Sequence, residues 1–257
     1  MPNSTTRSNK NPYYVFGVIL LALGWQMLSM LYDQVLVPSP IETLRALKEL
    51  FVSGELGQNL MITFRRQTGG LTAGIALGLV TGLFAGYFRR LDLLMQPLIS
   101  LLLAVPAIIF VTMAMVWLGM GTQMTTFLVA LLVFPVIHTN AAEGFKSVDR
   151  DLLEMAHVYR LPPVLTIKKI YLPGMRRYLI VGLSLSMASS VRLTIMAELL
   201  GAREGMGQRI AIARAYLETE KLFAWITVLL MILVSLEFLF IRPLKRCSSQ
   251  KEADFHD

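Results

Sequence analysis

Cysteine and charged residues are both scarce in this sequence. Cys247 is the only cysteine among 257 residues, so no disulfide bond can form within the chain. Charged residues make up 16% of the sequence and hydrophobic residues 55%, whereas soluble domains carry about 25% charged residues. The composition therefore excludes an ordinary soluble domain and indicates an integral membrane protein.

Two classes of ligand are not expected from the residue pattern. The formal net charge is +7, but a nucleic-acid-binding protein needs a soluble basic face, and here Lys and Arg stand in short segments beside apolar runs. His138 and His157 lack the spacing of metal ligands. We expect neither nucleic acid nor a metal ion to bind this chain.

Six apolar segments approach the length of about 20 residues that a membrane-spanning helix needs. They extend beyond strand length without a two-residue alternation, which indicates helices and argues against an outer-membrane barrel. The predicted fold is an all-α integral membrane protein with about six transmembrane helices. The six segments are residues 13–31, 69–87, 93–118, 122–142, 178–197 and 222–241.

The distribution of Lys and Arg predicts the orientation. These residues are concentrated in segments that share one side of the membrane if the N-terminus is inside, which places both termini in the cytoplasm of a bacterial inner-membrane protein. The first apolar run lacks a small-residue cleavage site, so we expect an uncleaved helix. We predict one membrane domain over residues 1–257, made of a cytoplasmic segment 1–12, a membrane core 13–241 that contains a cytoplasmic segment 143–177, and a cytoplasmic tail 242–257.

The second apolar segment contains a regular series of glycines. They recur every four residues and therefore form one stripe along the predicted helix, where small residues let another backbone approach closely. This pattern predicts tight helix packing. The stripe consists of Gly70, Gly74, Gly78, Gly82 and Gly86.

Segment 143–177 is too highly charged to lie in hydrocarbon. From Asp149 onward, apolar residues recur at the spacing of one helical face, and Leu-Pro-Pro at 161–163 should end this helix. Residues 164–171 can form a second short helix, and Leu-Pro-Gly at 172–174 should break the chain before the fifth span. The predicted apolar face of the first helix consists of Leu152, Met155, Ala156 and Tyr159.

Two short helices with exposed apolar residues would form a compact knob that binds either a lipid surface or a partner protein. Acidic lipid head groups are one candidate, because they attract basic side chains. However, Asp149, Asp151 and Glu154 crowd the start of the first helix, where they suit its N-terminus but would be repelled by acidic lipid. A partner protein is therefore favoured over lipid.

The same segment resembles a known motif. Glu154, Ala156, Ile170 and the pair Leu172 and Pro173 stand at the spacing of the EAA motif of the membrane subunits of bacterial ABC importers. The chain from the second span onward resembles the nitrate/sulfonate/taurine branch of these permeases. Similar stretches are the glycine-striped span, VPAIIFVTMAMVWLGMG, and AELLGAREGMGQRI.

The motif departs from the family pattern at two positions. Met155 replaces the first alanine, and Arg160 stands where the family has glycine. If that position is left-handed, a side chain there costs about 1 to 2 kcal/mol. Alternatively, Pro162 and Pro163 shape the turn.

The resemblance implies a multi-component transporter. Two cytoplasmic ABC ATPase subunits would bind ATP and magnesium, a second permease copy would complete a homodimer within membrane lipid, and an extracytoplasmic substrate-binding protein would deliver a small anionic solute such as nitrate, sulfonate or taurine. The chain lacks a GxxxxGK[ST] phosphate loop, so we expect it to be no enzyme and to carry no cofactor. The predicted ATPase-coupling residues are Leu152, Glu154, Met155, Ala156, Tyr159, Arg160, Ile170, Leu172 and Pro173.

Arg192 is predicted to lie inside the fifth span, where an ionisable group needs a partner or water. It could attract anions in a translocation pathway, or form an internal ion pair with Glu198 or Glu237. Glu198 could lie at the outer mouth of the pathway, or at a solvated helix end. Both alternatives remain open for each residue.

Serines give the fifth span a polar face that could line a path. In apolar helices, however, serines often bond only to their own backbone. The polar face contains Ser184, Ser186, Ser189 and Ser190, and the predicted pathway residues are Ser186, Ser189, Arg192 and Glu198.

The sequence also bears on functions other than an ABC importer permease. An intramembrane hydrolase is disfavoured because no GxSxG elbow or pair of membrane aspartates is present. A secondary transporter would be expected to show internal repeats and several midplane charges. The sequence has no clear repeat, and Arg192 is the one such charge, so this class is also disfavoured. Within the importer reading, a vitamin-precursor pyrimidine is the alternative substrate class, and the branch also includes bicarbonate importers.

Overall fold

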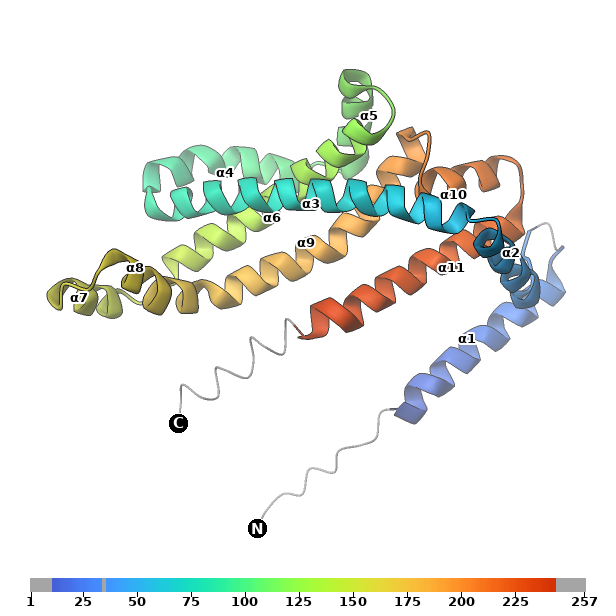
Figure 1. Ribbon diagram of the computed structural model, residues 1–257, viewed down its shortest axis with the longest axis horizontal. Helices are drawn as coiled ribbons and strands as arrows, with labels where there is room; N and C mark the ends of the chain where they lie inside the picture. The colour runs from blue at the N-terminus through green and yellow to red at the C-terminus, as the bar shows by residue number, and fades with distance from the viewer. Residues whose placement is uncertain (1–10, 34–35, 244–257) are drawn as a thin grey trace, which may run out of the picture.

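The computed structural model of the protein describes residues 11–33 and 36–243, and within these ranges every regular element is helical (Figure 1). The elements in chain order are α1 (Asn11–Leu31), α2 (Pro40–Val52), α3 (Glu55–Tyr87), α4 (Arg89–Ala104), α5 (Ala107–Leu118), α6 (Thr122–Lys146), α7 (Arg150–Val158), α8 (Pro163–Thr166), a π-helical turn (Ile167–Tyr171), α9 (Leu172–Gly201), α10 (Met206–Ala215), α11 (Thr219–Leu236) and a second π-helical turn (Glu237–Ile241). Cys247 and the C-terminal tail beyond residue 243 lie outside the described residues.

The described part contains four helical stretches long and apolar enough to cross a membrane. They are α3, α6, the continuous stretch from α8 to α9, and α11 with its π turn, and α4 with α5 makes a fifth if that bent pair is one span. In α1 the apolar part found within the described residues is shorter, at Ile19–Leu31. The all-α membrane class is confirmed, and the count is four to five spans within this part of the chain.

The predicted span over 93–118 is not one straight helix. The chain bends by 100° between α4 and α5, and both Val105 (ψ 131°) and Pro106 (ψ 133°) have left the helical conformation. The physical cause is Pro106, because a proline disfavours the α conformation of the residue before it. As a result, α5 projects from the bundle (Figure 1).

The centre of the molecule is the packing of α6 between α3 and α9. The glycine stripe of α3 faces α6: a Cβ added at Gly70 would lie 2.6 Å from the Cβ of Val129, and one added at Gly82 would lie 2.5 Å from the carbonyl oxygen of His138. Real Cβ atoms do not approach that closely, so only glycine permits this spacing of the two helices. Gly74, Gly78 and Gly86 meet α6 in the same way.

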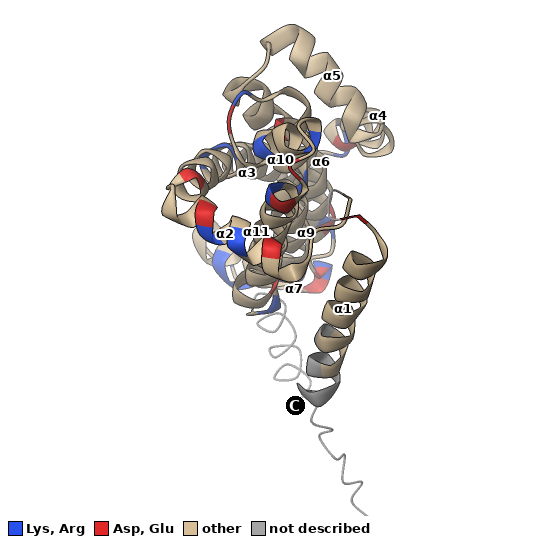
Figure 2. Cartoon of the chain, turned by 90° about the vertical axis from the view of Figure 1, so that its right-hand side faces the viewer, with Lys and Arg blue, Asp and Glu red and all other residues tan. Residues whose placement is uncertain are grey.

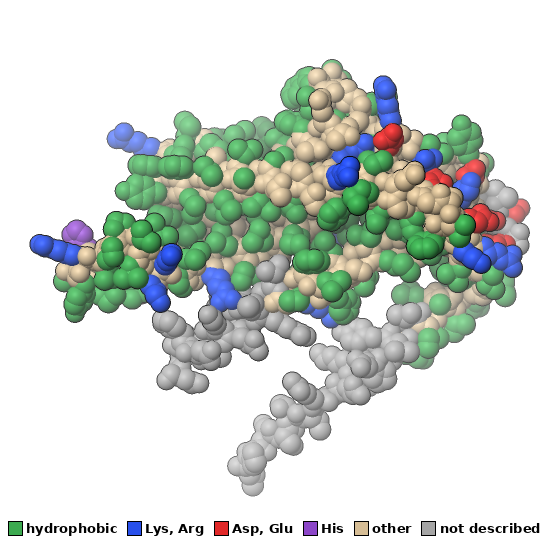
Figure 3. All heavy atoms as spheres, in the orientation of Figure 1, with side chains coloured by type: hydrophobic (Ala, Val, Ile, Leu, Met, Phe, Trp, Pro, Cys, Tyr) green, Lys and Arg blue, Asp and Glu red, His purple; other side chains and the backbone are tan. Residues whose placement is uncertain are grey.

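Charged side chains gather toward the two ends of the long helices, and hydrophobic side chains cover the middle of the face seen in Figure 3. One end carries α7 and α8, and the other carries α2 and α10 (Figure 1). Seen from the α10 end, α5 and α1 lie at opposite edges of the molecule (Figure 2). This distribution is typical of a protein whose middle lies in a lipid bilayer.

Candidate functional site

Residues 149–171, called the α7 knob below, consist of α7, α8 and the first π turn. Helix α7 begins where the sequence predicts: Asp149 is its N-cap, and its carboxylate accepts a hydrogen bond from the backbone N–H of Asp151 at 2.9 Å. Such a cap satisfies one of the N–H groups that a helix start leaves free. The knob therefore has a defined starting point after α6.

The knob has its own small core. Ala156 of α7 and Ile170 of the π turn are buried with Val148 and Met175, and Ala156 is only 5% exposed. The expectation that Ala156 shares an outward apolar face with its neighbours is therefore wrong, because Ala156 points inward. Two residues of the sequence motif thus hold the two parts of the knob together.

The outward side of the knob is apolar in part. Leu152, Met155 and Tyr159 are 41%, 43% and 73% exposed, and Glu154 lies exposed among them. Leu172, at the start of α9, is also exposed. Sequence reasoning missed Val158, which is 76% exposed. The knob occupies one end of the molecule, as Figure 3 shows.

The turn after α7 is a Schellman motif with Arg160 in the left-handed position (φ 48°). The N–H of Arg160 donates to the carbonyl of His157 at 3.1 Å, and the N–H of Leu161 donates to the carbonyl of Ala156 at 2.9 Å. Glycine is the usual residue at this position because it has no Cβ. The left-handed turn is therefore kept although the glycine is absent, and Pro162 and Pro163 only start the next helix.

The predicted break at Leu-Pro-Gly 172–174 is wrong. The helix continues from Pro163 to Gly201. A π turn accommodates Pro173: the N–H of Leu172 donates to the carbonyl of Ile167, five residues back. A wider turn of this kind makes room for a proline that has no N–H to donate, so the knob is joined rigidly to α9.

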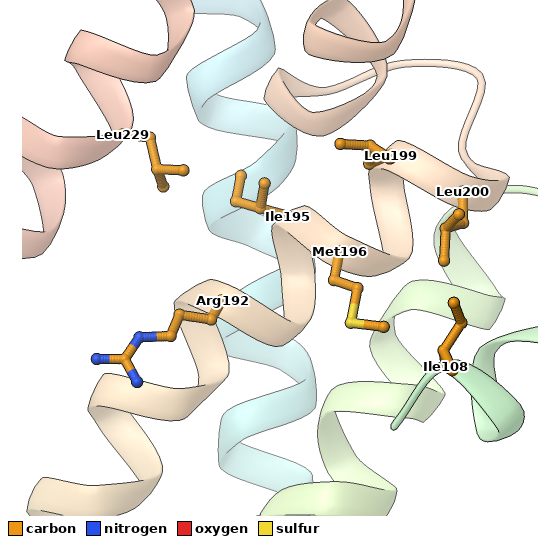
Figure 4. Close-up of a pocket in the computed structure, with 7 residues that line it drawn as sticks. All are labelled: Ile108, Arg192, Ile195, Met196, Leu199, Leu200 and Leu229. Carbon is orange, nitrogen blue, oxygen red and sulfur yellow. The ribbon is translucent and has the colours of Figure 1, made fainter. Parts of the chain in front are cut away.

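Along α9, Arg192 lies on an exposed face, not in the buried core. It borders an apolar groove of about 390 Å³ between α9, α5 and α11. Its guanidinium points away from Ile108 and Leu200, which line the other end of the groove (Figure 4). An exposed cation within a membrane-length helix needs a polar environment outside this single chain.

Glu198 is fully buried and pairs with Arg66, not with Arg192. Arg66 Nη1 lies 2.9 Å from Glu198 Oε1, and the two side chains are 4% and 0% exposed. Thr63 Oγ1 donates to Glu198 Oε2 at 2.8 Å. The alternative of a solvated helix end is therefore wrong, and Glu198 lines no open path in this conformation.

The serines of α9 divide between buried and partly exposed positions. Ser184 and Ser186 are 2% and 0% exposed, and Ser190 accepts a hydrogen bond from Gln67 Nε2 at 3.2 Å. Ser189 is half-buried and donates to the carbonyl of Ser186 at 3.2 Å. Of the four predicted pathway residues, only Ser189 and Arg192 therefore lie where a solute could reach them.

The two histidines within the described residues are structural or solvated. His138 is buried on α6, and its Nδ1 shares a hydrogen bond of 2.9 Å with Thr81 Oγ1 of α3. His157 is exposed on the knob. Within the described ranges no cluster of three or more His, Cys, Asp or Glu side chains could hold a metal ion.

Sequence reasoning missed Arg66 and its neighbours on α3, although a signal was present. Asn59, Thr63 and Gln67 stand four residues apart, and Gln67 precedes Gly70 by three, so they extend the helix face of the glycine stripe toward the start of α3. All three are buried, as is Arg66. This face of α3 therefore consists of small residues where α3 meets α6, and of polar residues where α3 meets α9 and α10.

The comparisons with known proteins agree with this architecture. The aliphatic sulfonates transport permease protein SsuC of Bacillus subtilis is 30% identical over 89% of this chain and 83% of its own length. The protein of the same name from Escherichia coli is 35% identical over 72% and 70%. Among solved structures, a chain of the inward-facing MetNI methionine ABC transporter matches with a TM-score of 0.60 at 17% identity, covering 74% of this chain and 95% of that one.

The family model covers most of the membrane core. It matches residues 74–243, from the second half of α3 to the end of the described chain. The region includes the α7 knob, α9 and α10. The chain therefore belongs to the family of binding-protein-dependent transport system inner membrane components.

Proposed function

We propose that the chain is the membrane-spanning subunit of an ATP-driven importer for a small anionic solute, with aliphatic sulfonates as the substrate class. Family membership supports the importer, and the two similar permeases named for aliphatic sulfonates support the substrate class. Arg192 on the exposed face of α9 supplies a positive charge that suits a sulfonate.

The observation that carries this proposal is the α7 knob. Its apolar side chains are exposed around Glu154, while Ala156 and Ile170 fix its shape from inside. Such an outward apolar helix face is the form in which a helix enters a groove on a partner. We assign the knob to a separate ATPase subunit, which would bind the ATP and magnesium, because the chain lacks a phosphate loop of its own.

The knob also suggests an orientation and an assembly. With the α7 end in the cytoplasm, both termini lie inside, and the α2 and α10 end faces an extracytoplasmic binding protein. One knob engages one ATPase, so two ATPases need two permease copies, which we take to be identical. Arg192 and Ser189 of each copy would then face a path between the copies.

Reconstitution tests this function. The chain is purified with its ATPase and binding protein and placed in proteoliposomes. We expect uptake of a labelled aliphatic sulfonate that requires both ATP and the binding protein, with nitrate and taurine as competing solutes. Uptake that continues without ATP would contradict the importer, and ATP-driven uptake of a neutral pyrimidine alone would contradict the substrate class.

A further inference from the structure

The start of α10 is capped by side chains from two other helices. A helix start leaves its first N–H groups without partners, and a side chain at the N-cap usually satisfies one of them. Here the N-cap is Gly205, which has no side chain. The N–H of Gly205 donates to Asn59 Oδ1 at 3.0 Å, that of Met206 to Thr63 Oγ1 at 2.9 Å, and that of Gly207 to Glu198 Oε2 at 3.0 Å.

Arg66 extends this arrangement to the turn before α10 and to α6. Its Nη1 donates both to Glu198 Oε1 at 2.9 Å and to the backbone carbonyl of Glu204 at 2.6 Å. Its Nε donates to Thr122 Oγ1 at 3.0 Å. The four side chains Asn59, Thr63, Arg66 and Glu198, called the α10 clamp below, therefore join α3, α9, α10 and the start of α6.

Two glycines make this close approach possible. A Cβ added at Gly205 would lie 2.6 Å from the carboxyl carbon of Glu198, and one added at Gly207 would lie 2.6 Å from the Cβ of Glu198. Gly205 also has a φ of 106°, which L side chains rarely adopt. The backbone of α10 is therefore shaped to receive the Glu198 carboxylate.

Moving α9 and α10 together away from α3 would separate Arg66 from Glu198 and leave the backbone N–H groups of Gly205 and Met206 without their partners on α3. Each unpaired buried charge or donor is costly. All four clamp side chains are buried, so water does not contact them in this arrangement. Separation of the helices at the α10 clamp is therefore costly.

We propose that Arg66 and Glu198 are positioning residues that keep α10 fixed to α3 and α9 throughout the transport cycle. The α10 end of these three helices then moves as one body, and outward access opens elsewhere, between this body and other parts of the transporter. This inference rests on the proposed import function, because one of its tests measures uptake. The other test measures hydrogen exchange at the start of α10 and needs only this chain.

A covalent tether tests the single-body claim without touching the clamp. Arg209 of α10 and Glu55 of α3 form a half-exposed ion pair, with Nε and Oε1 3.1 Å apart. In a Cys247→Ser background, Glu55→Cys and Arg209→Cys are joined with a short bifunctional maleimide. We expect the tethered importer to keep its ATP-dependent uptake to within about twofold of the untethered form, because nothing at this joint has to separate.

Rescue by the tether separates positioning from mere folding. Glu198→Gln leaves Arg66 as a buried unpaired charge, so we expect uptake to fall about tenfold or more and amide hydrogen exchange at 205–209 to speed up. Adding the tether should restore most of the uptake, because the tether then holds α10 against α3 in place of the clamp. Thr194→Ser, a buried conservative change elsewhere on α9, should alter neither readout.

The outcomes distinguish the two proposals. If the tether abolishes uptake while ATP hydrolysis continues, α10 has to separate from α3 and the inference is overturned. If Glu198→Gln leaves exchange at 205–209 unchanged, the clamp does not hold α10, and the inference is also overturned. If no variant imports any anion but exchange at 205–209 rises in Glu198→Gln, the clamp stands and the proposed function is wrong.

Discussion

The N–H of Leu161 donates to the carbonyl oxygen of Ala156 at 2.9 Å, and this bond closes the end of α7 over a left-handed Arg160. A non-glycine residue in that conformation costs about 1 to 2 kcal/mol. We therefore predict that Arg160→Gly raises the free energy of unfolding of the detergent-solubilised chain by about 1 kcal/mol, measured by denaturant titration.

A second position provides the control for that prediction. Leu217 (φ 58°) ends α10 in the same conformation, with the N–H of Glu218 donating to the carbonyl of Ala213 at 2.9 Å. Leu217→Gly should stabilise the chain by a similar amount, whereas Arg160→Ala, which keeps a Cβ, should not. A loss of stability in both glycine variants would show that the left-handed turns are unstrained.

The glycine stripe predicts a sharp contrast between neighbouring positions on α3. A Cβ at Gly78 would lie 2.7 Å from the Cβ of Ile137, whereas one at Gly69 would meet Thr126 at an ordinary 3.5 Å. Gly78→Ala should therefore destabilise the chain by about 1 to 3 kcal/mol through overpacking. Gly69→Ala, a matched change on the same helix, should be close to neutral. Equal melting temperatures for the two variants would contradict the packing account.

The capping box of α2 predicts a pH effect outside the membrane-spanning helices. The backbone N–H of Ser39 donates to the Glu42 carboxylate at 2.7 Å, and the Ser39 hydroxyl accepts from the N–H of Glu42. The bond from the Ser39 N–H to the carboxylate is the main cause that holds the pKa of Glu42 below its ordinary value of 4.5. Because the pKa of Glu42 is lower in the folded chain than in the unfolded chain, the capping box stabilises the fold above pH 4.5. This contribution to the free energy of unfolding is lost as the pH falls through the folded pKa.

Two measurements check the Glu42 prediction. An NMR titration of the Glu42 carboxyl carbon should give a midpoint below 4.5. The stability difference between the wild type and Glu42→Gln should be present at neutral pH and vanish in acid. A titration midpoint above 4.5, or a difference that grows as the pH falls, would contradict the assignment.

Arg192 predicts a change in solute handling without a change in fold. Its side chain is exposed on α9, so Arg192→Gln should leave the unfolding free energy within about 0.5 kcal/mol of wild type. Sulfonate uptake by the reconstituted importer should fall about tenfold, because the variant loses the charge-assisted hydrogen bonds that a guanidinium can donate to a sulfonate. Arg192→Lys should retain part of the uptake. Unchanged uptake in Arg192→Gln would remove this residue from the path.

Several elements could be predicted from the sequence because their signals are local. The start of α7 at Asp149 follows from capping chemistry, and the glycine stripe follows from a four-residue period. The direction in which Ala156 points could not be predicted, because periodicity does not say which edge of an apolar face meets the knob's own core. Likewise, Pro173 stays inside a helix because a π turn forms before it.

The partner of Glu198 could not be predicted from the sequence for a different reason. Its partner Arg66 lies 132 residues away on α3, and whether Glu198 meets Arg66 or Arg192 depends on how α3 packs against α9. The predicted second span began at residue 69, which left Arg66 outside it. The helix begins at Glu55 instead, which carries Arg66 into the buried region beside α9.

The central claim is that the α7 knob couples this chain to an ATPase, and capture of that ATPase tests it most directly. The tagged chain is purified from its native membranes in mild detergent as wild type, as Glu154→Arg on the knob, and as Glu49→Arg, an equally exposed acidic residue on α2 at the other end. Mass spectrometry should find a nucleotide-binding ATPase with the wild type and Glu49→Arg and little of it with Glu154→Arg, because the reversed charge opposes docking. An ATPase retained equally by all three forms, or absent from all three after gentle crosslinking, would contradict the account.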